Sequence, residues 1–248
     1  MRDIKDYAEK YVDEPFEETI VKIRKRMVIE QCNKYKHDHI LEIGCGMNPF
    51  FLDFKDYKKM VIAEPGDAFA DHAQEASDAQ GAGVQIVRGF LEERTDAIRA
   101  LGFDLDFIIL SSVLNELDEP QKMLEAIHSI CARETVVHIN VPNAYSLHRL
   151  LAKEMGLIED VHEQSAQMVK MQRKTTFDDK QLKEAVEAAG FEVVDSGSYF
   201  LKLFTHAQMQ KCMDAGIMDE QMIRGLEGMI KYMPQYGAGI YVNVRARA

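Results

Sequence analysis

The residues most suited to chemistry are two glycines and two carboxylates in the first third of the chain. The segment Glu42–Gly46 reads EIGCG, so Gly44 and Gly46 directly follow a short apolar run, and Glu64 ends the next apolar run. Glycine has no Cβ, so a ligand can approach the backbone closely at both positions. Glu42 is costly in an apolar run unless it has a polar or cationic partner. A carboxylate at Glu64 can accept hydrogen bonds from both hydroxyls of a ribose. The pattern favours a nucleoside-type ligand. The alternatives are a purely structural turn at Gly44 and Gly46 and a solvated charge at Glu64.

Two residues further along are candidates for acid–base catalysis. Glu116 follows the apolar run Leu105–Leu110 and can act as a general base or hold a substrate; the alternative is an exposed charge at a helix start. His148 is a second candidate base, although a lone histidine more often has a structural role. His138 lies within an apolar run, where a core histidine with satisfied hydrogen bonds is the favoured interpretation.

A basic helical face is a candidate site for the substrate. Ser146, Arg149 and Lys153 recur at spacings of three and four, which places them on one side of a helix. Arg149 can bind a carboxylate or phosphate through two parallel hydrogen bonds. With Asn143 just before the helix, these residues could bind an anionic substrate group. The alternative is a solvated basic face.

Alternating strands and helices must position these residues. Short apolar runs predict strands at 39–43, 59–63, 84–87, 105–110, 135–141, 191–194 and 239–244. Helical spacing predicts helices at about 67–79, 91–101, 120–131, from 145 onward and at 179–189. This alternation indicates a mostly parallel sheet that is covered on both faces. Ligands of such sheets bind beyond the carboxyl ends of the strands, where the glycines and Glu64 stand.

Together, the acid and glycines of 42–46, Glu64 and the run Ile108–Leu114 resemble the motifs of the class I S-adenosylmethionine-dependent methyltransferases. The resemblance covers roughly residues 38–145 and 175–248. It implies an α/β, Rossmann-like fold whose mostly parallel seven-stranded sheet has an antiparallel last strand and carries helical cap insertions. It also implies S-adenosylmethionine as cofactor, with S-adenosylhomocysteine as product. The cofactor-binding residues implied are Glu42, Gly44, Cys45, Gly46, Glu64, Pro65, Phe90 and Ser111.

The sequence departs from the family pattern at two positions. Asn48 stands where a third glycine is expected, and asparagine adopts left-handed backbone more readily than most other residues. Gly89 and Phe90 replace the acidic residue that often follows the third strand. The resemblance then implies that Phe90 packs beside the adenine and that its backbone N–H supplies the polar contact.

We expect a single methyltransferase domain over residues 1–248 with three segments that cover the site. Residues 1–38 read as an N-terminal helical cap, in which Tyr7, Tyr11 and Arg24–Arg26 can close over the carboxylate of the cofactor. Solvated charge is the favoured interpretation for most of that basic cluster. Residues 145–174 and 205–237 read as helical insertions that form a substrate cap.

Composition excludes several classes of function. The 248 residues carry 30 Lys and Arg against 41 Asp and Glu, a net charge of -11, and four cysteines. An acidic chain without a basic block lacks the electrostatic footprint of a nucleic-acid-binding protein. The separated cysteines and histidines predict no metal site. Apolar runs too short for a membrane span and a polar N-terminus predict a cytoplasmic protein without a membrane partner. A homodimer is left open.

We therefore predict a methyltransferase that moves a methyl group from S-adenosylmethionine to an oxygen or nitrogen of a small polar, anionic or sugar-type acceptor. Residues 141–149 and the C-terminal helices are similar to methyltransferases of bacterial surface-polysaccharide loci, some of which serve the assembly of methylated phosphoramidate or sugar groups. One alternative is a non-catalytic S-adenosylmethionine-binding protein with a regulatory or scaffold role. Another is an NAD(P)-binding Rossmann oxidoreductase, although Pro49 stands where its fingerprint requires glycine.

Overall fold

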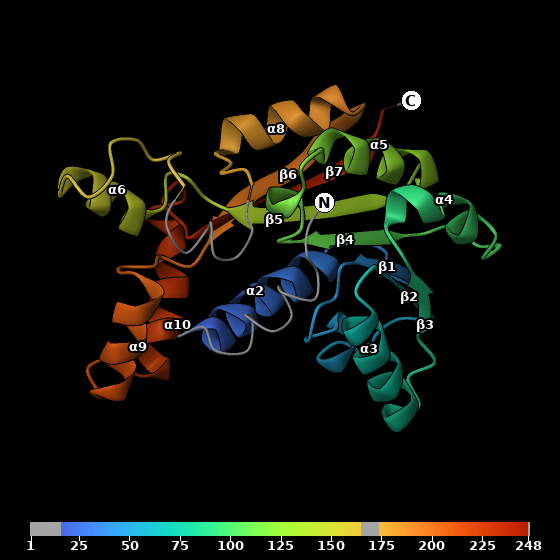
Figure 1. The fold of residues 1–248 in the computed structure, drawn as a ribbon, viewed down its shortest axis with the longest axis horizontal. Coiled ribbons are helices and arrows are strands. Elements are labelled where there is room, and N and C mark those ends of the chain that lie inside the picture. The colour runs from blue at the N-terminus through green and yellow to red at the C-terminus, as the bar shows by residue number, and fades with distance from the viewer. Residues whose placement is uncertain (1–15, 165–173, 248) are drawn as a thin grey trace.

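The computed structural model of the chain describes residues 16–164 and 174–247 and contains one seven-stranded sheet (Figure 1). The strands are β1 (His39–Ile43), β2 (Lys59–Glu64), β3 (Gln85–Arg88), β4 (Phe107–Ser111), β5 (Val136–Pro142), β6 (Phe191–Tyr199) and β7 (Gly239–Ala246). They lie in the order β3-β2-β1-β4-β5-β7-β6. β7 runs antiparallel to β5 and β6, and the other pairs are parallel. The predicted fold class is confirmed.

Helices cover both faces of the sheet (Figure 1). They are α2 (Glu17–Cys32), α3 (Asp67–Gln80), α4 (Leu91–Arg99), α5 (Pro120–Ile130), α6 (Leu147–Glu154), α8 (Asp179–Ala188), α9 (His206–Asp214) and α10 (Glu220–Gly228), with 3₁₀ turns η1 (Phe50–Leu52), η2 (Leu114–Glu116) and η3 (Met229–Lys231). In Figure 1, α4, α5 and α8 lie on one face, and α2 and α3 lie on the other. α6, α9 and α10 lie beyond one end of the sheet.

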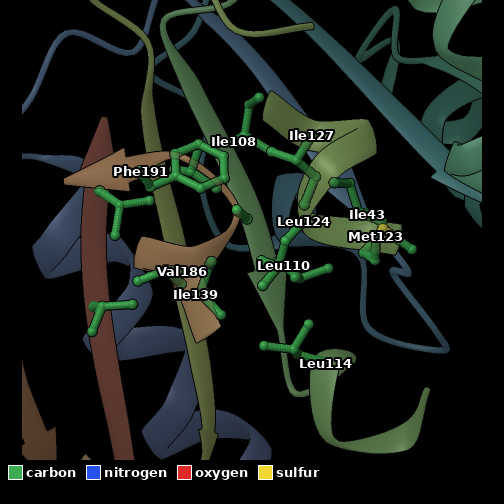
Figure 2. Close-up of a cluster of buried hydrophobic side chains, with 14 of the residues drawn as sticks. Ile43, Ile108, Leu110, Leu114, Met123, Leu124, Ile127, Ile139, Val186 and Phe191 are labelled. Carbon is green, nitrogen blue, oxygen red and sulfur yellow. The ribbon is translucent and has the colours of Figure 1, made fainter. Parts of the chain in front are cut away.

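β4 shows how the apolar runs build the two cores. Side chains of a strand point alternately to its two faces, so Ile108 and Leu110 enter one core and Phe107 and Ile109 enter the other. Figure 2 shows Ile108 and Leu110 against the apolar side of α5 and against α8. Because both faces are buried, the strand is apolar along its length, which is why its sequence predicts it so clearly.

A chain of buried polar side chains crosses the other face of the sheet. The Asn140 amide donates to Ser111 Oγ at 3.0 Å and to His138 Nε2 at 3.1 Å. His138 Nδ1 lies 2.8 Å from Asn243 Oδ1, and the Asn243 amide donates to Gln31 on α2. Burial lowers the pKa of His138 to about 4, so the ring is neutral near pH 7. His138 is thus a core histidine with satisfied hydrogen bonds, as the sequence predicts.

β6 is longer than predicted, and pairing explains the difference. The strand continues past residue 194 to Tyr199 because residues 195–199 pair with β7 from Asn243 to Gly239. That stretch reads DSGSY and has no apolar periodicity, so the sequence alone does not identify it.

The structure describes only part of the three predicted cap segments. Residues 1–15, which include Tyr7 and Tyr11, and residues 165–173 lie outside the described residues. The rest of the predicted N-terminal cap contains α2, the 145–174 segment contains α6, and the 205–237 segment contains α9, α10 and η3. The division into one domain with three caps stays a prediction. Within 16–164 and 174–247, no helix is both long and apolar enough to cross a bilayer.

Candidate functional site

The two glycines after β1 adopt left-handed backbone for different reasons. Gly44 has φ 73°, and a Cβ there would lie 2.8 Å from Cγ2 of Val113. Gly46 has φ 54°, and a Cβ there would meet no atom within 4 Å. The first glycine is therefore required by packing, whereas the second leaves open space beside the turn. Asn48 is not among the described residues with positive φ, so it does not reproduce the backbone of a third left-handed glycine.

We expect Gly44→Ala to lower the free energy of unfolding by about 2–5 kcal/mol, because it combines left-handed strain with overpacking against Val113. Gly102→Ala is the matched control, since Gly102 has φ 74° but open space around a Cβ. We expect the control to cost about 1–2 kcal/mol. Urea unfolding of both variants measures the difference. Equal losses would show that the contact with Val113 imposes no constraint.

Glu64 ties together the turns after β1 and β2. One carboxylate oxygen accepts the Gly66 N–H at 2.8 Å, and the other accepts the Gly46 N–H at 3.3 Å and faces Cys45 Sγ at 3.6 Å. Burial raises the pKa of this carboxyl. A carboxylate has about four lone-pair positions, so capacity remains for the hydroxyls of a ligand.

Glu42 supports the turn from inside. It is buried, and one of its oxygens accepts the Phe50 N–H at 2.9 Å, which closes the 42–50 segment. Burial raises the pKa of Glu42 to about 7, although the Phe50 N–H and the charge of Lys25 both act to lower it. The side chain therefore orders the glycine turn.

We expect Glu42→Gln to change how stability depends on pH. Between about pH 4.5 and pH 7 the folded chain binds more protons at Glu42 than the unfolded chain does. The contribution of this group to the free energy of unfolding therefore falls as pH rises through that window. Glutamine does not titrate, so the variant should gain up to about 3 kcal/mol relative to wild type between pH 4.5 and pH 8. Urea unfolding of both proteins at both pH values tests this. Parallel pH profiles would contradict it.

A cavity of about 430 Å³ lies beside the glycine turn, and we call it the glycine-turn cavity. The predicted site residues that line it are Gly44, Gly46, Glu64, Pro65, Phe90 and Glu116. Phe69, Leu91 and Met123 add apolar walls. The charged residues Glu92, Glu93, Asp118, Glu119 and Lys122 also line it, although most of the exposed lining surface is apolar. A cavity of this size with mostly apolar walls is typical of small-molecule sites. The open space at Gly46 and the remaining acceptor capacity of Glu64 fit an adenosine group. Of the other predicted cofactor residues, Glu42, Cys45 and Ser111 are not among the residues that line it.

A second, smaller cavity of about 110 Å³, which we call the polar cavity, is lined in part by residues that follow β4. Residues 112–116 form a wall between the two cavities, since Ser112 and Asn115 line the polar cavity whereas Val113 and Glu116 line the glycine-turn cavity. The two predicted catalytic residues are thereby separated. Glu116 lies on the glycine-turn side, and His148 lines the polar cavity.

Left-handed backbone at Ser112 shapes this wall. Ser112 has φ 58°, its N–H donates to Asn140 O, and its hydroxyl accepts from the Arg24 guanidinium at 3.1 Å. Left-handed backbone in a residue other than glycine is uncommon and tends to occur at functional sites. Of the predicted basic cluster, only Arg24 lines the polar cavity, because Lys25 binds Pro49 O and Asp53 and Arg26 binds Glu227.

Two buried polar groups face the polar cavity without partners. Asn115 is 1% exposed, and neither its amide nitrogen nor its amide oxygen has a hydrogen-bond partner in the described part of the chain. The same holds for Nδ1 of His148. Burial, together with the charges of Lys202 and Arg149, holds the pKa of His148 well below its usual value, so the ring is neutral near pH 7. Unsatisfied buried groups of this kind are expected where a ligand completes the hydrogen bonds.

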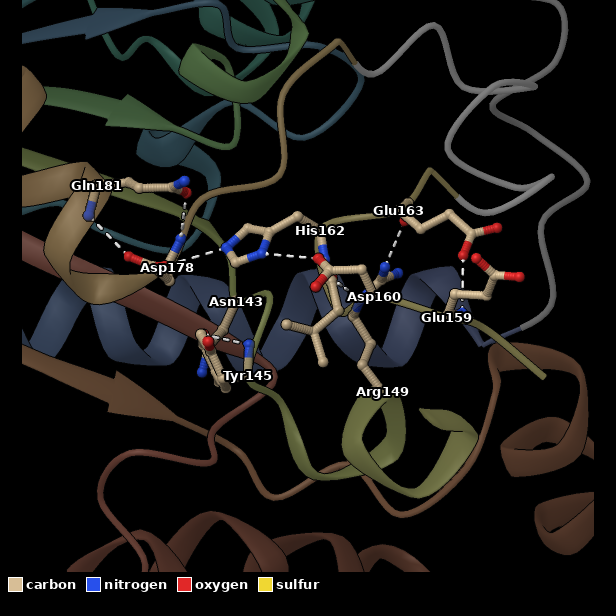
Figure 3. A network of polar contacts seen from close by, with 10 residues as sticks. Asn143, Tyr145, Arg149, Glu159, Asp160, His162, Glu163, Asp178 and Gln181 are labelled. Atoms are coloured by element: carbon tan, nitrogen blue, oxygen red, sulfur yellow. Dashed lines mark hydrogen bonds and ion pairs between the residues drawn. The ribbon is translucent and has the colours of Figure 1, made fainter. Parts of the chain in front are cut away.

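The predicted substrate residues do not all line the polar cavity. Arg149 lines the polar cavity, but two of its donors bind the carbonyls of Val161 and Glu163 (Figure 3). Asn143 also lines it, and its side chain binds Gln235 O, Gly237 O and the Tyr145 N–H. Both therefore also order neighbouring loops. Lys153 is exposed on α6 and is not among the residues that line either cavity.

Sequence reasoning missed several residues of the polar cavity. Asn115, Lys202, His206 and Tyr199 line it, and none of them belongs to a local motif. Asn115 lies shortly after β4, near a strand end, but a carboxylate is a commoner general base than an amide, so the sequence favours its neighbour Glu116. Lys202 and His206 reach the cavity only through the packing of the chain after β6. The described residues contain no group of three or more His, Cys, Asp or Glu side chains arranged for a metal ion.

Comparison with known families identifies the class of protein. Residues 13–196 match the family model described as a methyltransferase domain, so the chain belongs to that family. It is an S-adenosylmethionine-dependent methyltransferase, with S-adenosylmethionine as the methyl donor that this family implies. No curated protein matches the sequence.

Solved structures share the fold at low sequence identity. The plantazolicin methyltransferase BamL, in complex with a triazolic desmethylPZN analog and SAH, is 11% identical with a TM-score of 0.60, covering 99% of this chain and 97% of that one. An S-adenosylmethionine-dependent methyltransferase from Clostridium acetobutylicum is 10% identical with a TM-score of 0.58 and 92% coverage of both chains. The [4+2]-cyclase SpnF is 14% identical with a TM-score of 0.56, covering 90% of this chain and 80% of that one. At these identities the similarity concerns the fold.

Proposed function

We propose that the protein transfers a methyl group from S-adenosylmethionine in the glycine-turn cavity to an oxygen or nitrogen of a small polar acceptor in the polar cavity. The unpartnered amide of Asn115 carries this proposal. It is buried in the wall that both cavities share, where an acceptor would have to meet the donor. A fold of this type supports several chemistries, so the residues of the site determine which reaction the protein catalyses.

The residues of the glycine-turn cavity suit the donor. Glu64 binds the ribose hydroxyls, Phe90 packs beside the adenine, and Gly46 allows close approach of the backbone. Bound S-adenosylmethionine supplies an electrophilic methyl group on a sulfonium. Glu116, on the wall of this cavity, contributes to donor binding rather than to removing a proton from the acceptor.

The residues of the polar cavity orient the acceptor. Methyl transfer requires the attacking atom to lie in line with the methyl group, and positioning supplies much of the rate. Neutral His148 can accept the proton of a hydroxyl or ammonium, and Asn115 can both donate and accept a hydrogen bond. A polar acceptor with an anionic or sugar-type group, such as an intermediate of surface-polysaccharide or methyl phosphoramidate assembly, suits this lining.

A product assay tests the proposal. Protein, S-adenosylmethionine with a labelled methyl group and pools of small polar hydroxy and amino compounds are incubated together. We expect S-adenosylhomocysteine to form together with one labelled product that is heavier by one methylene. Donor binding without product from any pool would favour a non-catalytic regulatory or scaffold role, and binding of NADH in place of the donor would favour an oxidoreductase.

A further inference from the structure

Lys202 is held at the wall of the polar cavity although lysine is seldom buried. It is 3% exposed and lines the cavity. The turn that brings it there is firmly anchored. Phe200 has left-handed backbone with φ 58° and stacks on Phe16 with ring centroids 6.2 Å apart, and the Leu201 N–H donates to Leu226 O at 3.1 Å. The ammonium is therefore a fixed part of the cavity rather than a mobile surface charge.

His206 extends this wall as a hydrogen-bond donor. It is the first residue of α9, whose start is fixed by a capping box between Thr205 and Gln208. Lys202 Nζ lies 3.1 Å from His206 Nδ1, and an ammonium can only donate, so Nδ1 accepts. The imidazole is then neutral and carries its proton on Nε2. Lys202 and His206 together present a positive charge and a directed N–H.

The donors that line the cavity favour an anion. Lys202 brings a buried ammonium to the lining. Arg149 also lines the cavity, although Asp160 and Glu163 act on the charge of its guanidinium. The buried Asn115 amide, which has two N–H donors and no partner in the described chain, lies in the same lining. The cavity, at about 110 Å³, suits a compact group.

We infer that the methyl acceptor carries a compact oxyanion, a carboxylate or a phosphate, bound by Lys202 and His206 with Asn115 as a neutral donor. This inference rests on the proposed function and assigns the anionic group to the β6–α9 connection instead of to Arg149 and Lys153. Charge-assisted hydrogen bonds from an ammonium to such oxygens are among the stronger polar contacts in proteins. The oxyanion orients the acceptor, and the attacking oxygen or nitrogen belongs to another part of the same molecule.

Binding of simple oxyanions to the protein saturated with S-adenosylhomocysteine tests this inference. Calorimetry first establishes that each protein binds S-adenosylhomocysteine. Inorganic phosphate and acetate are then added in separate titrations at constant ionic strength, with chloride as the balancing ion, and the imidazole proton resonances of His206 and His148 are followed by NMR. Lys202→Gln is the test variant, Lys202→Arg retains the charge, and Lys211→Gln on the exposed side of α9 is the matched control.

We expect phosphate, acetate or both to shift the His206 resonances saturably. Binding should weaken at least about tenfold in Lys202→Gln, recover in part in Lys202→Arg and stay within about twofold of wild type in Lys211→Gln. A response to phosphate alone assigns a phosphoryl acceptor, and a response to acetate alone assigns a carboxylate. No response to either anion, or equal responses in Lys202→Gln and wild type, overturns the inference while the proposed function stands. Failure of wild type to bind S-adenosylhomocysteine is the separate result that overturns the proposed function.

Discussion

Replacing Glu64 with glutamine should weaken the binding of S-adenosylhomocysteine about 100-fold. The carboxylate is buried and holds the N–H groups of Gly46 and Gly66, so its remaining lone pairs point from a fixed position toward the glycine-turn cavity. Each charge-assisted hydrogen bond to a ribose hydroxyl contributes about 1.5–3 kcal/mol, and glutamine keeps only one acceptor oxygen. Glu64→Ala should bind more weakly still, because both turns also lose their link. Isothermal titration calorimetry measures the affinities.

The control for this prediction is Glu75→Ala, which removes an exposed carboxylate from α3. We expect its affinity to stay within about twofold of wild type, since distant exposed charges are screened. Circular dichroism of each variant checks that the fold is intact. An affinity for Glu64→Gln within threefold of wild type in a folded sample would show that this carboxylate does not contact the ribose.

Replacing His148 with alanine should lower kcat about 10²- to 10⁴-fold and leave the affinity for S-adenosylhomocysteine nearly unchanged. His148 lines the polar cavity, and its unpartnered Nδ1 is free to take the proton of an acceptor bound there. The assay uses an acceptor identified by the product screen. Because alanine leaves a void in a buried site, His148→Gln provides a second variant with similar volume and the same expected loss of kcat.

Glu116→Gln should affect donor binding more than turnover, the opposite of what we expect for His148→Ala. Glu116 lines the glycine-turn cavity, so its substitution should raise KM for S-adenosylmethionine more than it lowers kcat. His72→Ala on α3, whose side chain lines neither cavity, is the control for loss of a histidine. If Glu116→Gln loses kcat and His148→Ala keeps it, the assignment of the base to the polar cavity is wrong.

The parts of the fold that the sequence predicted well are those with a local physical signature. β4 is apolar on both faces because both are buried, and α8 begins with a capping box between Asp178 and Gln181 that can be read from the chain. The second half of β6 has no such signature. Its residues are held by pairing with β7, about 45 residues away along the chain, so no local pattern reveals it.

The residues of the candidate site also fall into those that a local pattern predicts and those that it does not. Gly44, Gly46 and Glu64 stand at strand ends, and the topology of a parallel sheet alone brings strand ends together, so their position beside one cavity could be expected. Lys202 and His206 reach the polar cavity through the left-handed turn at Phe200 and the packing of α9. The turn and the packing of α9 both depend on contacts between segments that are distant along the chain. The side on which Glu116 lies depends on the winding of η2, which spacing along the chain does not determine.

Calorimetric titration of the wild-type protein with S-adenosylhomocysteine, beside a titration with NADH, tests the central claim most directly. The glycine-turn cavity predicts saturable binding of one S-adenosylhomocysteine per chain and no binding of NADH. A folded sample that binds NADH, or that binds neither ligand, would contradict the assignment of this cavity to the methyl donor.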